Sequence, residues 1–76
     1  MPTVANFGSF RIRMYFGDHN PPHVHVDSAD YAALVSIAEA KVIEGRIDPK
    51  FRKAALQWVA ANRPTLGEKW QELHPE

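Results

Sequence analysis

The sequence predicts one small α+β domain over residues 1–76, in which a small antiparallel β-sheet of about four strands packs on a C-terminal helix kinked or broken near Pro64. Two periodicities carry this prediction. In the first half of the chain, apolar residues alternate with polar ones, which is typical of half-buried strands. From Asp48 onward, apolar residues recur with a period of about 3.6, which is typical of an amphipathic helix. A helix with one apolar stripe provides the cover that a sheet with one apolar face requires.

Alternation and turn residues place the four expected strands. The first covers residues 9–16, where every second side chain is apolar, and the second is His23–Val26. The two consecutive prolines between them cannot donate to a ladder, so we expect an extended loop there. The third and fourth strands are expected over residues 31–37 and 41–45, where β-branched residues outweigh alanine and glutamate.

The helix is expected to begin with Asp48 as its N-cap and Pro49 at the first helical position. Its apolar stripe keeps one phase across Pro64, which falls about 220° from the start of the stripe, on the solvent side. One kinked helix and two helices with a short break both fit this pattern, and the continuous phase favours the kink. The stripe, which should bury both tryptophans, consists of Phe51, Ala55, Trp58, Val59, Leu66, Trp70 and Leu73.

Composition limits the possible functions. The chain has no cysteine, which excludes disulfides and thiolate metal sites. No window approaches the roughly 18 apolar residues of a membrane helix, and the first residues lack the features of a signal peptide, so we expect a soluble cytoplasmic protein. Nine Lys and Arg residues balance nine Asp and Glu residues. This balance lacks the basic excess usual for nucleic-acid binders, although a local basic face remains compatible with it.

The residues best suited to chemistry lie on or between the first two expected strands. If the apolar members of these strands face the helix, their neighbours face the opposite side of the sheet. His19 lies in the loop between the strands, beside Asp18 and Asn20. The side chains expected together on the outer face are Arg11, Arg13, Tyr15, His23 and His25.

Three interpretations of this cluster stay open, and the first is structural. The loop would be a stiff connector, and the arginines and the tyrosine would solubilise an exposed strand face. In the second interpretation the cluster is an RNA site, where Arg11 and Arg13 bind phosphates and Tyr15 stacks on a base. The catalytic candidates, two of which would act as general base and general acid on one phosphodiester, are His19, His23 and His25.

The third interpretation is a metal site. His23 and His25 form a His-x-His pair on a strand, so both rings point to the same side, and His19 or Asp18 would supply a third ligand. Because His-x-His alone recurs by chance, no metal and no other cofactor is assigned. His74 lies near the end of the chain and is expected to be solvated.

Several segments resemble one known family. The longest is Arg13–His25, which contains the run Asp-His-Asn-Pro-Pro-His, and the others are residues 1–4, 42–46 and 55–66 together with Trp70. Through them the chain is similar, over nearly its whole length, to a family of short bacterial proteins called domain of unknown function 4160. Relatives tend to carry Glu, His and an acidic residue near Gln57, Asn62 and Pro64, so chemistry in this chain would rest on the three histidines.

The resemblance implies a gene arrangement rather than a reaction. Family members are often encoded beside another small domain, which suggests toxin–antitoxin pairs. The expectation is therefore a toxin-like component that binds RNA, and whether it also cleaves RNA as an enzyme stays open. The alternative is a non-enzymatic module that pairs with a small antitoxin-like partner. An exposed edge strand would also make a homodimer plausible.

Overall fold

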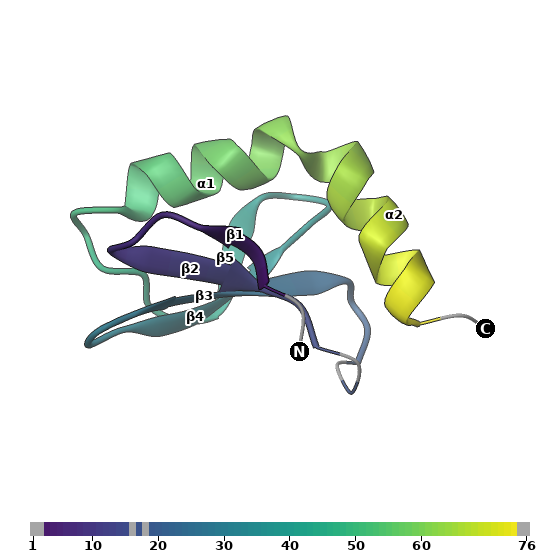
Figure 1. Ribbon diagram of the computed structural model, residues 1–76, viewed down its shortest axis with the longest axis horizontal. Helices are drawn as coiled ribbons and strands as arrows, with labels where there is room; N and C mark the ends of the chain where they lie inside the picture. The colour runs from purple at the N-terminus through teal and green to yellow at the C-terminus, as the bar shows by residue number, and fades with distance from the viewer. Residues whose placement is uncertain (1–2, 16, 18, 75–76) are drawn as a thin grey trace.

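The computed structural model describes residues 3–15, 17 and 19–74, which form one five-stranded sheet and two helices (Figure 1). All neighbouring strands are antiparallel, and their order in the sheet follows the chain. The strands are β1 (Thr3–Asn6), β2 (Phe10–Arg13), β3 (His23–Ser28), β4 (Ala32–Ser36) and β5 (Lys41–Gly45). The helices, which lie on the same side of the sheet, are α1 (Arg52–Ala61) and α2 (Arg63–Leu73). The expected α+β class is confirmed.

The sheet has five strands, so the expectation of four is wrong. The strands β2 to β5 correspond to the four expected ones, and the additional strand is β1. Val4 and Ala5 of β1 pack against the core, and both are half-buried. The register of β1 on β2 shifts between Thr3 and Ala5. A four-residue edge strand with such an irregularity shows no regular alternation, so periodicity carries no signal for it.

The alternation expected in the first half of the chain is confirmed by the packing. Ile12 lies opposite Val26 in register, and Val24 lies opposite Val35. These four side chains are at most 2% exposed and belong to the same core cluster as the buried helix residues. Met14 continues the pattern just beyond β2 and is also fully buried. The expected inner face of the sheet is therefore the face that the helices cover.

The C-terminal part has two helices separated by Asn62 rather than one kinked helix. The Asn62 side chain donates from Nδ2 to the Trp58 carbonyl at 2.8 Å, and its backbone N–H donates to the same carbonyl at 3.1 Å. Pro64 lies in the first turn of α2, where its missing N–H would have no helical partner. Trp58 is half-buried, and the fully packed members of the stripe are Ala55, Val59, Leu66 and Trp70. Among the described residues, neither helix is long and apolar enough to cross a membrane.

The start of the first helix differs from the expectation. Asp48 is not an N-cap, because α1 begins at Arg52. Instead, the Asp48 carboxylate accepts the backbone N–H of Lys50 at 3.0 Å, and its carbonyl accepts that of Phe51 at 2.9 Å. An aspartate bonded to the N–H two residues ahead forms a turn that competes with helix. This turn brings the Phe51 ring onto Phe10, with centroids 5.3 Å apart.

Candidate functional site

The face of the sheet opposite the helices is uncovered (Figure 1), and one line of paired residues crosses it from β2 to β5. Arg13 pairs with His25, His25 pairs with Leu34, and Leu34 pairs with Glu44. Residues paired in register project to the same side of a sheet. We call these four residues the cross-strand row. It runs from a cation through an imidazole and an apolar side chain to a carboxylate.

A second line of paired residues lies beside the cross-strand row. In it Arg11 pairs with Asp27, and Asp27 pairs with Ala32. The charge of Arg11 is therefore opposed by a carboxylate directly across the ladder, whereas Arg13 has His25 at that position. The two arginines expected on the outer face are both there, but their electrostatic surroundings differ. Arg13 is the better placed of the two to bind an added anion.

An irregularity in β5 places Glu44 in the cross-strand row. The pairing of β4 with β5 shifts between Leu34 and Val35, so that Ile43 is the extra residue between two paired positions. Simple alternation from the inward-facing Val42 would turn Glu44 toward the helices. A bulge reverses that parity, so Glu44 reaches the open face beside Ile43, which is 45% exposed. The sequence does not reveal this site residue, because alternation gives no sign of the bulge in β5.

The three candidate histidines line one pocket on the open face. Its volume is about 350 Å³, which is within the range of small-ligand sites. The exposed His19 comes from the loop, and His23 and His25 come from β3. The other lining residues are Gly17, Asn20, Pro21, Leu34, Ile43 and Glu44. The sequence therefore identified the histidines that meet here. Phe16 and Asp18, which sequence analysis assigned to the first strand and to the turn or metal site, lie outside the described residues.

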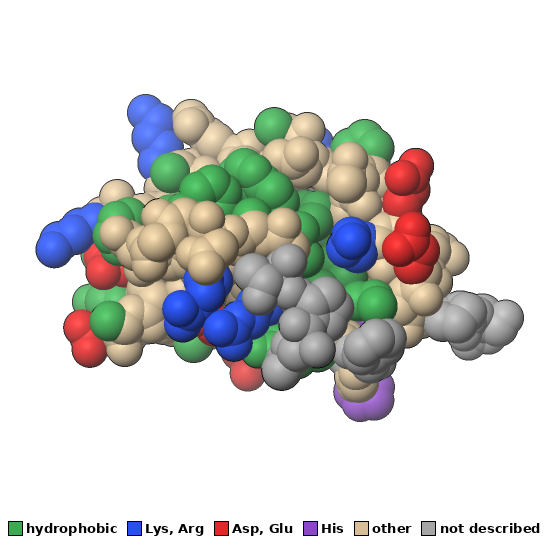
Figure 2. Space-filling view, in the orientation of Figure 1, with side chains coloured by type: hydrophobic (Ala, Val, Ile, Leu, Met, Phe, Trp, Pro, Cys, Tyr) green, Lys and Arg blue, Asp and Glu red, His purple; other side chains and the backbone are tan. Residues whose placement is uncertain are grey.

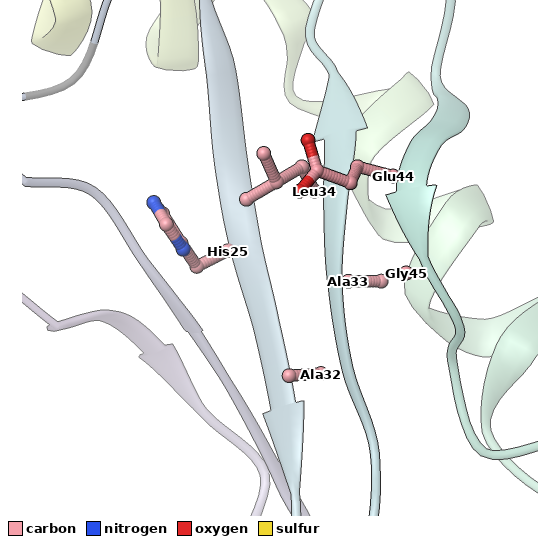
Figure 3. Close-up of a pocket in the computed structure, with 6 residues that line it drawn as sticks. All are labelled: His25, Ala32, Ala33, Leu34, Glu44 and Gly45. Carbon is pink, nitrogen blue, oxygen red and sulfur yellow. The ribbon is translucent and has the colours of Figure 1, made fainter.

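A second pocket adjoins the histidine pocket. It has a volume of about 280 Å³ and shares His25, Leu34 and Glu44 with its neighbour. The remaining lining residues are small: Ala32, Ala33 and Gly45. In Figure 3 the side chains of Leu34 and Glu44 lie close together, whereas His25 projects to the other side of β3. His25, Leu34 and Glu44 therefore form the part of the open face that the two pockets share.

His23 is not on the open part of the outer face, which corrects the sequence-based expectation. It is only 7% exposed, and its ring lies 5.4 Å from that of Trp70, measured between centroids. In Figure 1, α2 runs down past the end of the sheet where β3 begins, which agrees with the contact between Trp70 of α2 and His23. The His23 Nδ1–H donates to the Pro21 carbonyl at 2.8 Å, because a carbonyl can only accept.

Aromatic and imidazole rings form a chain from the open face to α2. The ring of Tyr15 meets His25 edge-on with centroids 4.4 Å apart, and His25 lies 5.4 Å from His23. Beyond His23, the ring of Trp70 stacks on His74 at 3.8 Å. His74 is thus half-buried instead of solvated, and its Nδ1–H donates to the Trp70 carbonyl at 2.9 Å. The C-terminal turn of α2 therefore supports the wall of the histidine pocket.

Both arginines of β2 are half-buried, and their Nε atoms are buried without a hydrogen-bond partner among the described residues. Their aliphatic parts therefore lie along the sheet and restrict where the guanidinium groups can go. Figure 2 shows Lys and Arg side chains on several sides of this view, including the lower side, where acidic side chains also lie. Arg11 and Arg13 bring two basic side chains to the open face, on which Asp27 and Glu44 also lie in register.

A metal site has less geometric support. No group of three His, Asp or Glu side chains within residues 3–15, 17 and 19–74 is arranged to hold an ion. His23 and His25 lie near each other, but the Nδ1 proton of His23 is already held by Pro21. The proposed third ligand Asp18 lies outside the described residues.

Comparison with known proteins identifies a family and no activity. Residues 9–71 match the family described as domain of unknown function 4160, and this chain belongs to that family. The match covers both pockets and the cross-strand row, so the site lies within the part shared with the family. No curated protein and no solved structure shows a significant match.

Proposed function

We propose that this protein binds single-stranded RNA on the open face of its sheet, as the toxin-like component of a two-gene module. The observation that carries the proposal is the cross-strand row, in which Arg13 and His25 stand beside a pocket lined by three histidines. Single-stranded RNA is commonly bound on open sheets, where cationic groups contact phosphates and rings stack on bases. The edge-on pair of Tyr15 and His25 provides rings for that purpose.

The two arginines take different parts in this proposal. Arg13 contacts a phosphate, because the residue paired with it is a histidine and no carboxylate opposes its charge there. Arg11 lies across from Asp27, so it contributes less to phosphate binding. A small number of phosphate contacts fits a chain whose overall charge is zero. It also predicts moderate affinity with a shallow salt dependence.

The histidine pocket has the groups that metal-independent RNA cleavage requires. In our proposal His25 removes the proton of a ribose 2′-hydroxyl, whose oxygen attacks the adjacent phosphorus. His19, from the loop, donates a proton to the leaving 5′-oxygen, so the P–O5′ bond breaks and a 2′,3′-cyclic phosphate and a 5′-hydroxyl form. His23 is a positioning residue. Its ring lies beside that of His25, and its hydrogen bond to the Pro21 carbonyl links β3 to the loop.

Binding is tested with fluorescently labelled single-stranded RNA in an anisotropy titration at low and moderate salt. Removing one phosphate contact with Arg13→Ala should weaken binding and lower the salt slope by roughly 0.7. The matched control is Arg52→Ala, which removes the same charge from an exposed position on α1. Binding that is absent at low salt, or that Arg13→Ala and Arg52→Ala reduce equally, would contradict the proposal.

Cleavage is tested on the same RNA with the ends of the products identified. The expected products carry a cyclic phosphate and a 5′-hydroxyl, EDTA has no effect, and a 2′-deoxy substitution at the cleaved position stops the reaction. Paired acid and base groups also predict a bell-shaped dependence of rate on pH. His25→Ala and His19→Ala should each lower the rate at least about 100-fold, the usual contribution of one such group. Activity that survives both substitutions would exclude the catalytic role and leave RNA binding to be judged separately.

A second candidate function is supported by the edge of the sheet. Ile43 of β5 is 45% exposed and lies beside Leu34, and unpaired edge strands are common docking positions for other chains. A small antitoxin-like partner, or a second copy of this chain, would bind there without any catalysis. Co-expression with the product of the adjacent gene tests this candidate. Ile43→Lys should abolish a stable complex, whereas Lys53→Glu on exposed α1 should not.

A further inference from the structure

The second pocket begins at His25, which is part of the proposed phosphate-binding end of the cross-strand row. From there it extends along the row to Leu34 and Glu44. Glu44 is two strands away from His25, a separation of roughly 10 Å at the usual spacing between strands. Nucleotides have a phosphate at one end and a base at the other, and the row has a cation at one end and a carboxylate at the other. A nucleotide with its phosphate at Arg13 and His25 therefore places its base toward Glu44.

The lining of this pocket suits a flat ring. Ala32 and Leu34 contribute apolar side chains, Gly45 has no side chain, and the side chain of Ala33 belongs to the buried core. At Gly45, φ is +78°, and an added Cβ would meet the backbone oxygen of Ala32 and lie 3.0 Å from Ala33 Cα. The close approach of the two strands thus depends on glycine at this position. Glu44 carries the only carboxyl group among the side chains of the lining residues that the structure describes.

A lone carboxylate distinguishes the four bases. It only accepts hydrogen bonds, and it binds best to two parallel donors. Guanine presents two adjacent donors, N1–H and N2–H, on its Watson–Crick edge. Adenine and cytosine each present one amino donor next to a ring nitrogen that repels a carboxylate, and uracil presents one N–H between two carbonyls. Only guanine matches both oxygens of Glu44.

We propose that this pocket is a base-binding subsite specific for guanine, in which the carboxylate of Glu44 accepts both donors of the base. This inference rests on the proposed RNA-binding function and makes it more specific. It assigns Glu44 a role in specificity rather than in catalysis. It also explains how an acidic residue fits into an RNA site, since Glu44 faces the base and lies at the far end of the row from Arg13.

The test uses labelled oligouridylates that carry one guanosine, adenosine, cytidine or inosine at the centre. The guanosine oligonucleotide should bind at least about tenfold more tightly than the adenosine and cytidine ones, as expected for one bidentate contact. Inosine lacks the N2 amino group and should lose roughly half of that advantage on a logarithmic scale. Glu44→Gln should remove the preference for guanosine without weakening the binding of plain oligouridylate.

Two further variants complete the experiment. Glu68→Gln on exposed α2 is the matched control, because it removes the same charge away from the sheet face. Ala32→Leu fills the pocket without changing charge and should also abolish the preference. Circular dichroism melting checks that each variant is folded. If Ala32→Leu unfolds, the guanine subsite is judged on Glu44→Gln, which is the smaller of the two changes to the pocket.

The outcomes separate this inference from the proposed function. RNA binding that depends on Arg13 but shows no preference for guanosine, or a preference that Glu44→Gln retains, overturns the guanine subsite alone. Absence of RNA binding in the unmodified chain overturns both. A preference lost in Glu44→Gln and Ala32→Leu, and kept in Glu68→Gln, supports the subsite.

Discussion

The two faces of this sheet are built from the same strands yet differ in how far their side chains are buried. On the covered face, β2, β3 and β4 contribute side chains such as Ile12, Val24 and Val35, which are fully buried under the helices. On the open face, the same strands contribute Arg13, His25 and half-buried Leu34. Strand alternation therefore separates the core side chains from those of the open face, residue by residue. Substitutions on one face should therefore change folding, and those on the other should change ligand binding.

The largest expected difference between the faces is in the free energy of unfolding. Leu66→Ala removes a side chain that is fully buried in the covered core and should cost about 2–5 kcal/mol. Leu34→Ala, on the open face, should cost about 1 kcal/mol, since that side chain is already partly hydrated. Urea denaturation followed by tryptophan fluorescence measures both. Equal losses would mean that the open face is also part of the core.

The next largest effect concerns the close contact between β4 and β5. Gly45→Ala introduces a Cβ against the Ala32 carbonyl and a side chain at positive φ, so it should cost about 1–3 kcal/mol. Gly67→Ala on α2 is the matched control, because an added Cβ there meets nothing within 4 Å. It should be neutral or stabilise by up to about 1 kcal/mol. Thermal melts that rank the two variants the other way would contradict the geometry of the bulge.

His23 and His25 test the boundary between the two faces. His23→Ala removes a buried ring in contact with Trp70 and a hydrogen bond to Pro21, so it should destabilise the fold by about 1–3 kcal/mol. His25→Ala should cost less than about 1 kcal/mol but should weaken RNA binding more than any effect on folding explains. Denaturation measures the loss of stability in each variant, and RNA anisotropy measures the loss of binding. A His25→Ala protein as unstable as His23→Ala would place both rings in the core.

The smallest expected difference lies within the open face. Arg13→Ala should weaken RNA binding several-fold, and Arg11→Ala should weaken it less, because Asp27 already opposes the charge of Arg11. The double substitution Arg11→Ala with Asp27→Ala should be close to neutral for binding. Salt-dependent anisotropy resolves these differences. Equal losses from the two arginine substitutions would show that register does not distinguish them.

The sequence predicted the faces correctly for most residues of each regular period, with the exception of His23, which is buried against Trp70 of α2. Alternation around Ile12 and Val24 placed Arg13 and His25 together, and the helical stripe identified Ala55, Val59, Leu66 and Trp70 as core. It failed where the structure departs from a period. The edge strand β1 is short and irregular, and the turn at Asp48 competes with the expected helix start. Glu44 was missed because a bulge changed its face.

Local chemistry alone therefore determined the fold class, the inner and outer sides of the central strands, and the loop that supplies His19. These features depend on side chains that are neighbours along the chain, whose directions follow from backbone geometry. Tertiary structure decided the rest: the burial of His23 by α2, the stacking of His74 on Trp70, and the arrival of Glu44 beside Leu34. Each of these contacts joins segments that are distant in the sequence, and each depends on a helix break or a shift of register. Such contacts cannot be predicted from the periodicity of one segment.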